Sequence, residues 1–217
     1  MKLYTHALSP FSAKVRIVLR EKGLQFDDEQ LPITRKTILS KPERLLAANP
    51  RGQVPTLFDE DLVLYDSTVI LEYLEERAPT PALLPVGAKA RARARLLEDD
   101  ADWLMNGAIV DLLAETYRKP DPATRDEGKI ADTAKVIRSA YGRLEHVLKD
   151  GRPHLCGEPF TLSDVSWLLP VSFAAAFGVP PGEGVPALGA WLARVAARPS
   201  VAAETKAMRE ALAKLPD

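Results

Sequence analysis

The pattern of hydrophobic and polar positions changes its character at about residue 77. Before that point, short alternating runs typical of strands are mixed with helical runs, whereas beyond it the apolar spacing is helical throughout. This change predicts two domains. We place the first at residues 1–77, a stiff proline-rich linker at 78–87 and the second at 88–217. The predicted fold class is an α/β first domain followed by an all-α second domain.

A helix is expected directly after Pro10, because Phe11, Val15 and Val18 recur on one helical face and Gly23 provides a stop. The other elements expected in the first domain are a strand at 3–5, a weak polar strand within 25–33, irregular or short helical pieces from 34 to 49, a hairpin with strands at 56–58 and 62–65, and a helix that starts at about 67 and ends before Pro79.

The second domain is expected to consist of helices at 88–117, 122–149, 161–177, 187–197 and about 201–215. The uncharged run 165–179 is too short to span a membrane and contains Pro170, so we interpret it as a buried central helix. Thr161 and Asp164 have the spacing of a capping box, to which we assign a role in folding only.

Composition and charge narrow the class of partner. With 217 residues, 46% of them hydrophobic, the chain can bury a core. A formal net charge of -1 gives no basic field for a nucleic acid or an anionic membrane, which favours a small-molecule partner. The single cysteine, Cys156, excludes an intrachain disulfide. Together with the lack of a signal-peptide pattern, it predicts a cytoplasmic protein. His6, His146 and His154 lack metal-ligand spacing, so no metal is expected.

Basic residues recur at every second position at the start of the second domain, at Lys89, Arg91, Arg93 and Arg95. Residues with this spacing cannot form a single stripe on a helix. They form either a solvated helix start or a contact with a second subunit. The acidic surface that could meet them there consists of Glu72, Glu75 and Glu76.

Ser9 is the residue with the clearest chemical potential. It stands at the N-cap of the expected helix, with Pro10 at the first helical position. A hydroxyl can accept a hydrogen bond from the helix backbone while it donates its own proton to an anion. Lowering a thiol pKa by about two units requires about 2.7 kcal/mol. A hydrogen bond to a charged group contributes about 1.5–3 kcal/mol, and a helix terminus adds about 0.3–1 kcal/mol. Stabilisation of a thiolate beside Ser9 is therefore reasonable in scale.

Four motifs resemble segments of the cytosolic glutathione transferases. They are SPFSAKVRIVLREKGL at 9–24, NPRGQVPTL at 49–57, LYDSTVILEYL at 64–74 and FTLSDVSWL at 160–168. In this order and spacing they are highly specific, and the resemblance covers the whole chain. It is to serine-type, bacterial-like members similar to the tau, phi, theta and zeta classes. It implies a thioredoxin-like first domain, an all-helical-bundle second domain and glutathione as co-substrate.

The resemblance assigns roles to individual residues. Ser9 would donate to the glutathione sulfur, and a cis bond before Pro55 would turn the backbone of Val54 toward the tripeptide. Asp66 and Ser67 would hold the γ-glutamyl end. The remaining implied contacts are Gln53, and Lys41 at the glycyl carboxylate, or failing it Lys36 or Arg35. The acceptor pocket implied by the family plan contains Ala7, Leu8, Phe11, Trp103 and Asn106.

Residues 9–11 differ in two ways from those of related families, and each difference argues against one type of reaction. Ser9 stands where thiol-disulfide exchange branches have Cys, and Pro10 and Phe11 replace the Ser-Cys continuation of maleylacetoacetate isomerases. Ser12 is an alternative thiolate donor. The leading hypothesis is a homodimeric detoxification enzyme that transfers glutathione to an apolar electrophile. The alternatives are a non-catalytic partner-binding module and a ligandin-like carrier.

Overall fold

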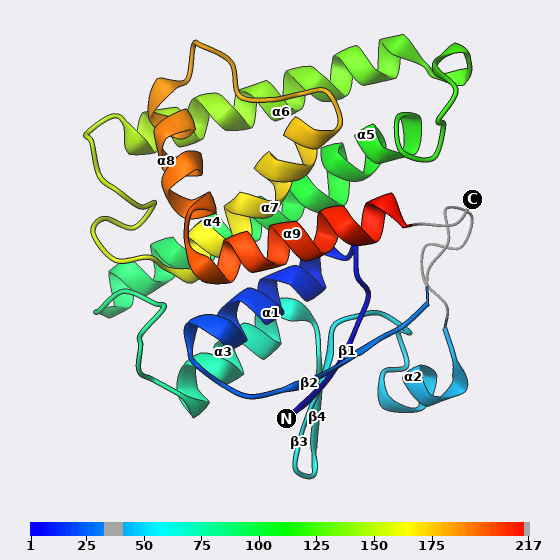
Figure 1. The fold of residues 1–217 in the computed structure, drawn as a ribbon. Helices are drawn as coiled ribbons and strands as arrows, with labels where there is room; N and C mark the ends of the chain where they lie inside the picture. The colour runs from blue at the N-terminus through cyan, green and yellow to red at the C-terminus, as the bar shows by residue number, and fades with distance from the viewer. Residues whose placement is uncertain (33–40, 215–217) are drawn as a thin grey trace. The chain divides into compact units, whose positions relative to one another are not determined.

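The computed structural model describes residues 1–32 and 41–214 (Figure 1). By its contacts the chain divides into two units. The first unit comprises Met1–Ala82 together with Arg198–Asp217, and the second comprises Leu83–Ala197. The domain limits predicted from the sequence stay a prediction, but this division differs from them because the last helix packs with the first unit.

Within the described residues, four strands form the sheet of the first unit, in the order β2-β1-β3-β4. β1 (Lys2–Thr5) pairs in parallel with β2 (Asp27–Gln30) and antiparallel with β3 (Thr56–Asp59). β3 also pairs antiparallel with β4 (Leu62–Tyr65). With its helices, this mixed sheet confirms the predicted thioredoxin-like domain.

The described helices of the first unit are α1 (Pro10–Glu21), α2 (Glu43–Ala48), α3 (Ser67–Arg77) and α9 (Pro199–Ala213). Successive side chains of a strand point to opposite faces. Tyr4 packs with Leu45 of α2 and with Phe58, so α2 covers that face, while Leu3 and Leu57 are buried on the other. α1 packs against both α3 and α9, and Figure 1 shows the red α9 running beside the blue α1.

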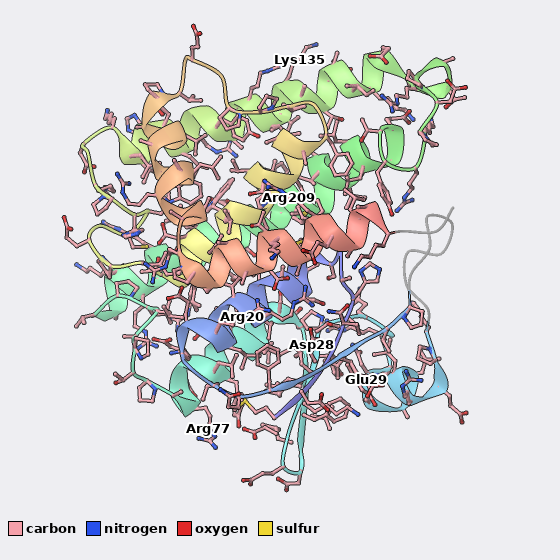
Figure 2. The ribbon with its side chains drawn as sticks, viewed as in Figure 1. Arg20, Asp28, Glu29, Arg77, Lys135 and Arg209 are labelled. Atoms are coloured by element: carbon pink, nitrogen blue, oxygen red, sulfur yellow. The ribbon has the colours of Figure 1, made fainter. Side chains whose placement is uncertain are left out.

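Buried charges join α1 to α9. Glu204, which is 1% exposed, lies against Arg16 and Arg20 of α1. Arg16 also lies 3.9 Å from Asp28 of β2. Figure 2 labels Asp28 and its neighbour Glu29, which pairs with Lys2 and Arg44 instead. The helix expected from 201 is therefore part of the first unit's packing.

Glu21 forms a second link between these helices. Its carboxylate accepts hydrogen bonds from Arg198 at 2.6 and 3.1 Å and from the Ser200 hydroxyl. Burial alone would raise the pKa of Glu21, but the hydrogen bonds from Arg198 and Ser200 outweigh burial and lower it. Glu21 is therefore held in its charged form at the start of α9.

The described elements of the second unit are helical, as predicted. They are α4 (Ala88–Leu104), a π-helical turn (Met105–Ile109), α5 (Val110–Glu115), a 3-10 turn (Pro122–Thr124), α6 (Glu127–Leu148), α7 (Leu162–Ala176) and α8 (Pro186–Ala196). α7 packs against α4 and α8, and most of its residues are buried despite Pro170. The interpretation of this segment as a central helix is therefore confirmed.

Two helices of this unit differ from their expected limits. The helix expected at 88–117 is interrupted by the π-helical turn, which contains Gly107, a poor helix former. The helix expected from Pro122 begins at Glu127, because the Asp126 side chain accepts a hydrogen bond from the Lys129 N–H and caps the helix there.

Each half of the predicted linker is tied to its own unit. In the first unit the buried Lys22 ammonium donates to the carbonyl oxygens of Ala78 at 2.7 Å and Pro81 at 3.0 Å, and it pairs with Glu75 at 2.7 Å. In the second unit the Leu83 carbonyl accepts from the Leu162 N–H at 2.8 Å. Because Glu75 is buried against Lys22, it is not part of the acidic surface that the sequence offered for contact with a second subunit.

Candidate functional site

Ser9 occupies the predicted N-cap of α1. Its Oγ accepts a hydrogen bond from the Ser12 N–H at 3.2 Å, and its own N–H donates to the His6 carbonyl at 3.1 Å. Because Oγ is the acceptor in the capping bond, its proton remains available for another acceptor. Ser9 is partly exposed, whereas Ser12 is 0% exposed. This difference in access favours Ser9 over Ser12 as a ligand contact.

The turn before Ser9 is held by His6. The side chain of His6 is buried, and its Nδ1 accepts a hydrogen bond from the Leu8 N–H at 3.1 Å. This bond requires an unprotonated Nδ1, which places the proton of a neutral ring on Nε2. Ala7 and Leu8 are partly exposed on this turn, as is Phe11 in the first turn of α1. The sequence analysis considered His6 only for its lack of metal-ligand spacing and missed its contact with the Leu8 N–H.

The loop before β3 is organised by Asn49, a residue that the sequence analysis did not single out. Asn49 is 1% exposed, and its Nδ2 donates to the Gln53 carbonyl at 2.8 Å while its Oδ1 accepts from the Arg51 N–H at 2.9 Å. The Thr56 hydroxyl adds a bond to the same Gln53 carbonyl at 3.1 Å. A signal was present in the sequence, because Asn directly before Pro favours a turn.

The Val54–Pro55 peptide bond at the end of this loop is cis. The Val54 side chain packs against the cluster that contains Tyr4, Leu31 and Leu45, and Gln53 is exposed beside it. None of the loop hydrogen bonds given above uses the N–H or C=O of Val54. These two backbone groups are the pair that the sequence analysis assigned to a ligand backbone.

Lys41 lies beside the same loop. Its Nζ is 3.4 Å from the Arg51 carbonyl, and a Cβ added to Gly52 would be 2.9 Å from Lys41 Cδ. Gly52 has φ 58°, a conformation that favours glycine. The alternatives Lys36 and Arg35 lie outside the described residues.

Asp66 and Ser67 stand at the junction of β4 and α3. Asp66 has φ 78°, and its Oδ1 accepts from the N–H groups of Thr68 at 3.0 Å and Val69 at 3.4 Å. Asp66 Oδ2 lies 3.7 Å from Arg51 Nη1. The structure thus brings the 49–55 loop next to the start of α3, as a site for a charged ligand end requires.

The predicted residues of the second unit lie on an exposed part of it. Trp103 is 64% exposed near the end of α4, and Asn106 is exposed in the π-helical turn.

Cys156 is partly exposed with its Sγ 3.3 Å from the Ser163 hydroxyl. Among the described residues, no group of three or more His, Cys, Asp or Glu side chains could hold a metal ion. No described helix has the length and apolar character needed to cross a membrane.

Comparison with known families matches both parts of the chain. Residues 8–77 match the model of the glutathione S-transferase N-terminal domain, and residues 106–199 match that of the C-terminal domain. The chain belongs to the glutathione S-transferase family. The resemblance inferred from the four motifs is therefore confirmed for both domains.

Individual relatives of the chain carry different names. Proteins named stringent starvation protein A homolog are 32% identical over 92% of this chain and 87% of the Pasteurella multocida protein, and 47% identical over 45% of this chain and 44% of the Coxiella burnetii protein. The latter match thus spans less than half of that relative's length. A maleylacetoacetate isomerase of Pseudomonas aeruginosa is 41% identical over 53% of this chain and 57% of its own length.

A solved structure adds a ligand to this comparison. The theta class glutathione S-transferase of Xanthomonas axonopodis pv. citri, solved with glutathione bound, has a TM-score of 0.80 and 26% identity, covering 94% of this chain and 95% of that one. Glutathione is thus the ligand recorded in a family member that shares this fold over nearly its whole length.

Proposed function

We propose that this protein binds glutathione, stabilises its thiolate beside Ser9 and transfers it to an electrophilic, apolar small molecule. The observation that carries the proposal is the geometry of Ser9, whose Oγ accepts the capping bond from Ser12 and keeps its own proton for a ligand. The N-terminus of α1 adds a favourable dipole for a negative charge at that position. Thiolate stabilisation and proximity then supply the catalysis, and no covalent enzyme intermediate is needed.

The remaining contacts of the proposed ligand follow the loop and the start of α3. The backbone of Val54 before Pro55 would pair with the tripeptide, and Gln53 would contact it from the side. Asp66 and Ser67 would hold the γ-glutamyl end. We propose Lys41 for the glycyl carboxylate, since it already lies beside the same loop.

The acceptor side of the reaction is proposed in two parts. Ala7, Leu8 and Phe11 offer partly exposed apolar surface close to Ser9 in sequence. Trp103 and Asn106 stay a prediction for the second unit. A homodimer and a detoxification role are proposed from family membership, and a cytoplasmic location from the single cysteine.

Titration of bound glutathione tests the proposal. We expect thiolate absorbance near neutral pH with the wild type, loss of this signal with Ser9→Ala and loss of conjugation to a generic aryl halide. Ser9→Asp is the matched control, because Asp keeps the N-cap while its charge opposes a nearby thiolate. An Asp variant as stable as the wild type but without the thiolate signal would separate capping from catalysis. Unchanged ionisation with Ser9→Ala would contradict the role of Ser9.

A second candidate is a member that uses the fold to bind a partner or carry an apolar molecule. Some relatives of this chain are named stringent starvation protein A homolog, which does not denote an enzyme. Their similarity favours the non-catalytic function. The same titration distinguishes the two. A wild type that binds glutathione with an unperturbed thiol, or not at all, supports the partner-binding candidate. Ionised glutathione without turnover of any aryl halide supports a carrier.

A further inference from the structure

Arg51 lies at the point where the 49–55 loop meets α3. Its Nη1 is 3.7 Å from Asp66 Oδ2, and its guanidinium carbon lies 5.3 Å from the ring centroid of Tyr65. The Arg51 side chain is 59% exposed and that of Asp66 is 43% exposed. An ion pair this open to solvent contributes little to folding, and both of its members are accessible to a ligand.

The backbone of Arg51 is held although its side chain is exposed. Its N–H donates to Asn49 Oδ1 at 2.9 Å, and its carbonyl lies 3.4 Å from Lys41 Nζ. The side chain therefore projects from a fixed point, and the face of Tyr65 offers the guanidinium a cation-π contact. This arrangement limits the freedom that an exposed arginine would otherwise lose on binding a ligand.

The first turn of α3 is already partly used by the protein itself. Asp66 Oδ1 accepts from the N–H groups of Thr68 and Val69, two groups that could otherwise receive a ligand carboxylate. Ser67, which is 6% exposed, is the first residue of the helix, and Asp66 does not bond its N–H. A carboxylate bound here needs a further donor, and Arg51 is the cation beside it.

We propose that Arg51 is a specificity-determining residue that receives the α-carboxylate of the ligand's γ-glutamyl end. This inference rests on the proposed function. Asp66 pairs with the ammonium group next to that carboxylate. Ligand binding therefore replaces the exposed ion pair between Arg51 and Asp66 with two ion pairs between the protein and the ligand. The planar guanidinium suits a carboxylate because it can donate two parallel hydrogen bonds. The site then selects peptides with a free α-amino-acid end.

Binding of two peptides tests this role. Calorimetry would compare glutathione with γ-aminobutyryl-cysteinylglycine, which lacks only the α-carboxylate, on the wild type and Arg51→Gln. We expect Arg51→Gln to lower the affinity for glutathione by about tenfold or more and to leave the affinity for the analogue unchanged. The affinity of Arg51→Lys for glutathione should lie between those of the wild type and Arg51→Gln, because lysine keeps the positive charge but cannot donate two parallel hydrogen bonds. Arg44→Gln is the matched control, since Arg44 is 52% exposed and pairs with Glu29 at 2.9 Å.

The possible failures are distinguishable. If the wild type does not bind glutathione, both the proposed function and this inference are overturned. If the wild type binds it but Arg51→Gln binds it equally well or more tightly, only the role of Arg51 is overturned. Equal weakening of both peptides by Arg51→Gln would also overturn it, because the loss would then not depend on the α-carboxylate.

Discussion

The carboxylate of Glu204 in α9 receives the guanidinium of Arg16 in α1, with Arg16 Nε donating to Oε1 at 2.9 Å and to Oε2 at 3.1 Å. Their side chains are 2% and 3% exposed, and Arg20 donates to Glu204 Oε2 at 2.5 Å. A buried pair of this kind is costly to break, because the remaining charge stays away from water. It explains how the last helix of the chain becomes part of the first unit.

We expect Glu204→Ala to lower the free energy of unfolding by about 3–5 kcal/mol, because it leaves Arg16 buried without its main partner. Urea unfolding would measure the change. Glu210→Ala on the same helix is the control, since Glu210 pairs with Lys206 at 4.0 Å on the surface, and it should cost less than about 1 kcal/mol. Equal effects of the two variants would contradict a stabilising role for the buried pair.

The pH dependence of stability should report the Glu21 contact. Hydrogen bonds from Arg198 and Ser200 hold the pKa of Glu21 below its ordinary value of 4.5. As the pH falls, the Glu21 carboxyl is protonated at a higher pH in the unfolded chain than in the folded protein. The Glu21 contact therefore stabilises the fold fully above about pH 4.5, and this stabilisation is lost as the pH falls through the lower pKa of the folded state. Denaturant unfolding at several pH values would show a smaller acid loss in Glu21→Gln than in the wild type. An identical acid loss in both would contradict this, and the exposed Glu76→Gln serves as control.

Asn49 should affect both stability and ligand affinity. Asn49→Ala removes the donor to the Gln53 carbonyl and the acceptor for the Arg51 N–H, which should cost about 1–3 kcal/mol of unfolding free energy. The loop that it holds is the proposed binding edge, so glutathione affinity should fall as well. Asn49→Asp keeps the acceptor but places a buried carboxylate oxygen against the Gln53 carbonyl, so it should cost at least as much as Asn49→Ala. Calorimetry and thermal unfolding would test both effects, and a stability loss with unchanged affinity would assign Asn49 to folding alone.

Asp164 should be the most sensitive polar residue of the second unit. It is 0% exposed and accepts hydrogen bonds from the N–H of Leu155, the N–H and hydroxyl of Thr161 and the indole of Trp191, at 2.8–2.9 Å. Asp164→Ala should cost about 3 kcal/mol or more, since it leaves several buried donors unpaired. Thermal unfolding followed by tryptophan fluorescence would measure it. The exposed Asp111→Ala is the control, and a comparable shift for both would contradict the prediction.

The sequence by itself determined the elements whose signals are local. The N-cap at Ser9, the hairpin from Thr56 to Tyr65 and the capping box at Thr161 depend on residues within a few positions of one another, and the structure has each of them. The family and its fold also followed from the sequence, because four short motifs in a fixed order carry them. The limits of long helices did not, since the π-helical turn after Leu104 divides a segment whose apolar spacing is continuous.

Only the tertiary structure decided which charges are buried and which residues support the candidate site. Glu204 and Arg16 are 188 positions apart, and each alone has the pattern of an ordinary surface residue of its helix. Arg51 is likewise an unremarked loop residue until the fold brings it to Asp66, which lies in another element. The physical reason is common to these cases: the energy of a charged or polar side chain depends on the partners and the dielectric around it, and these are set by contacts distant in sequence.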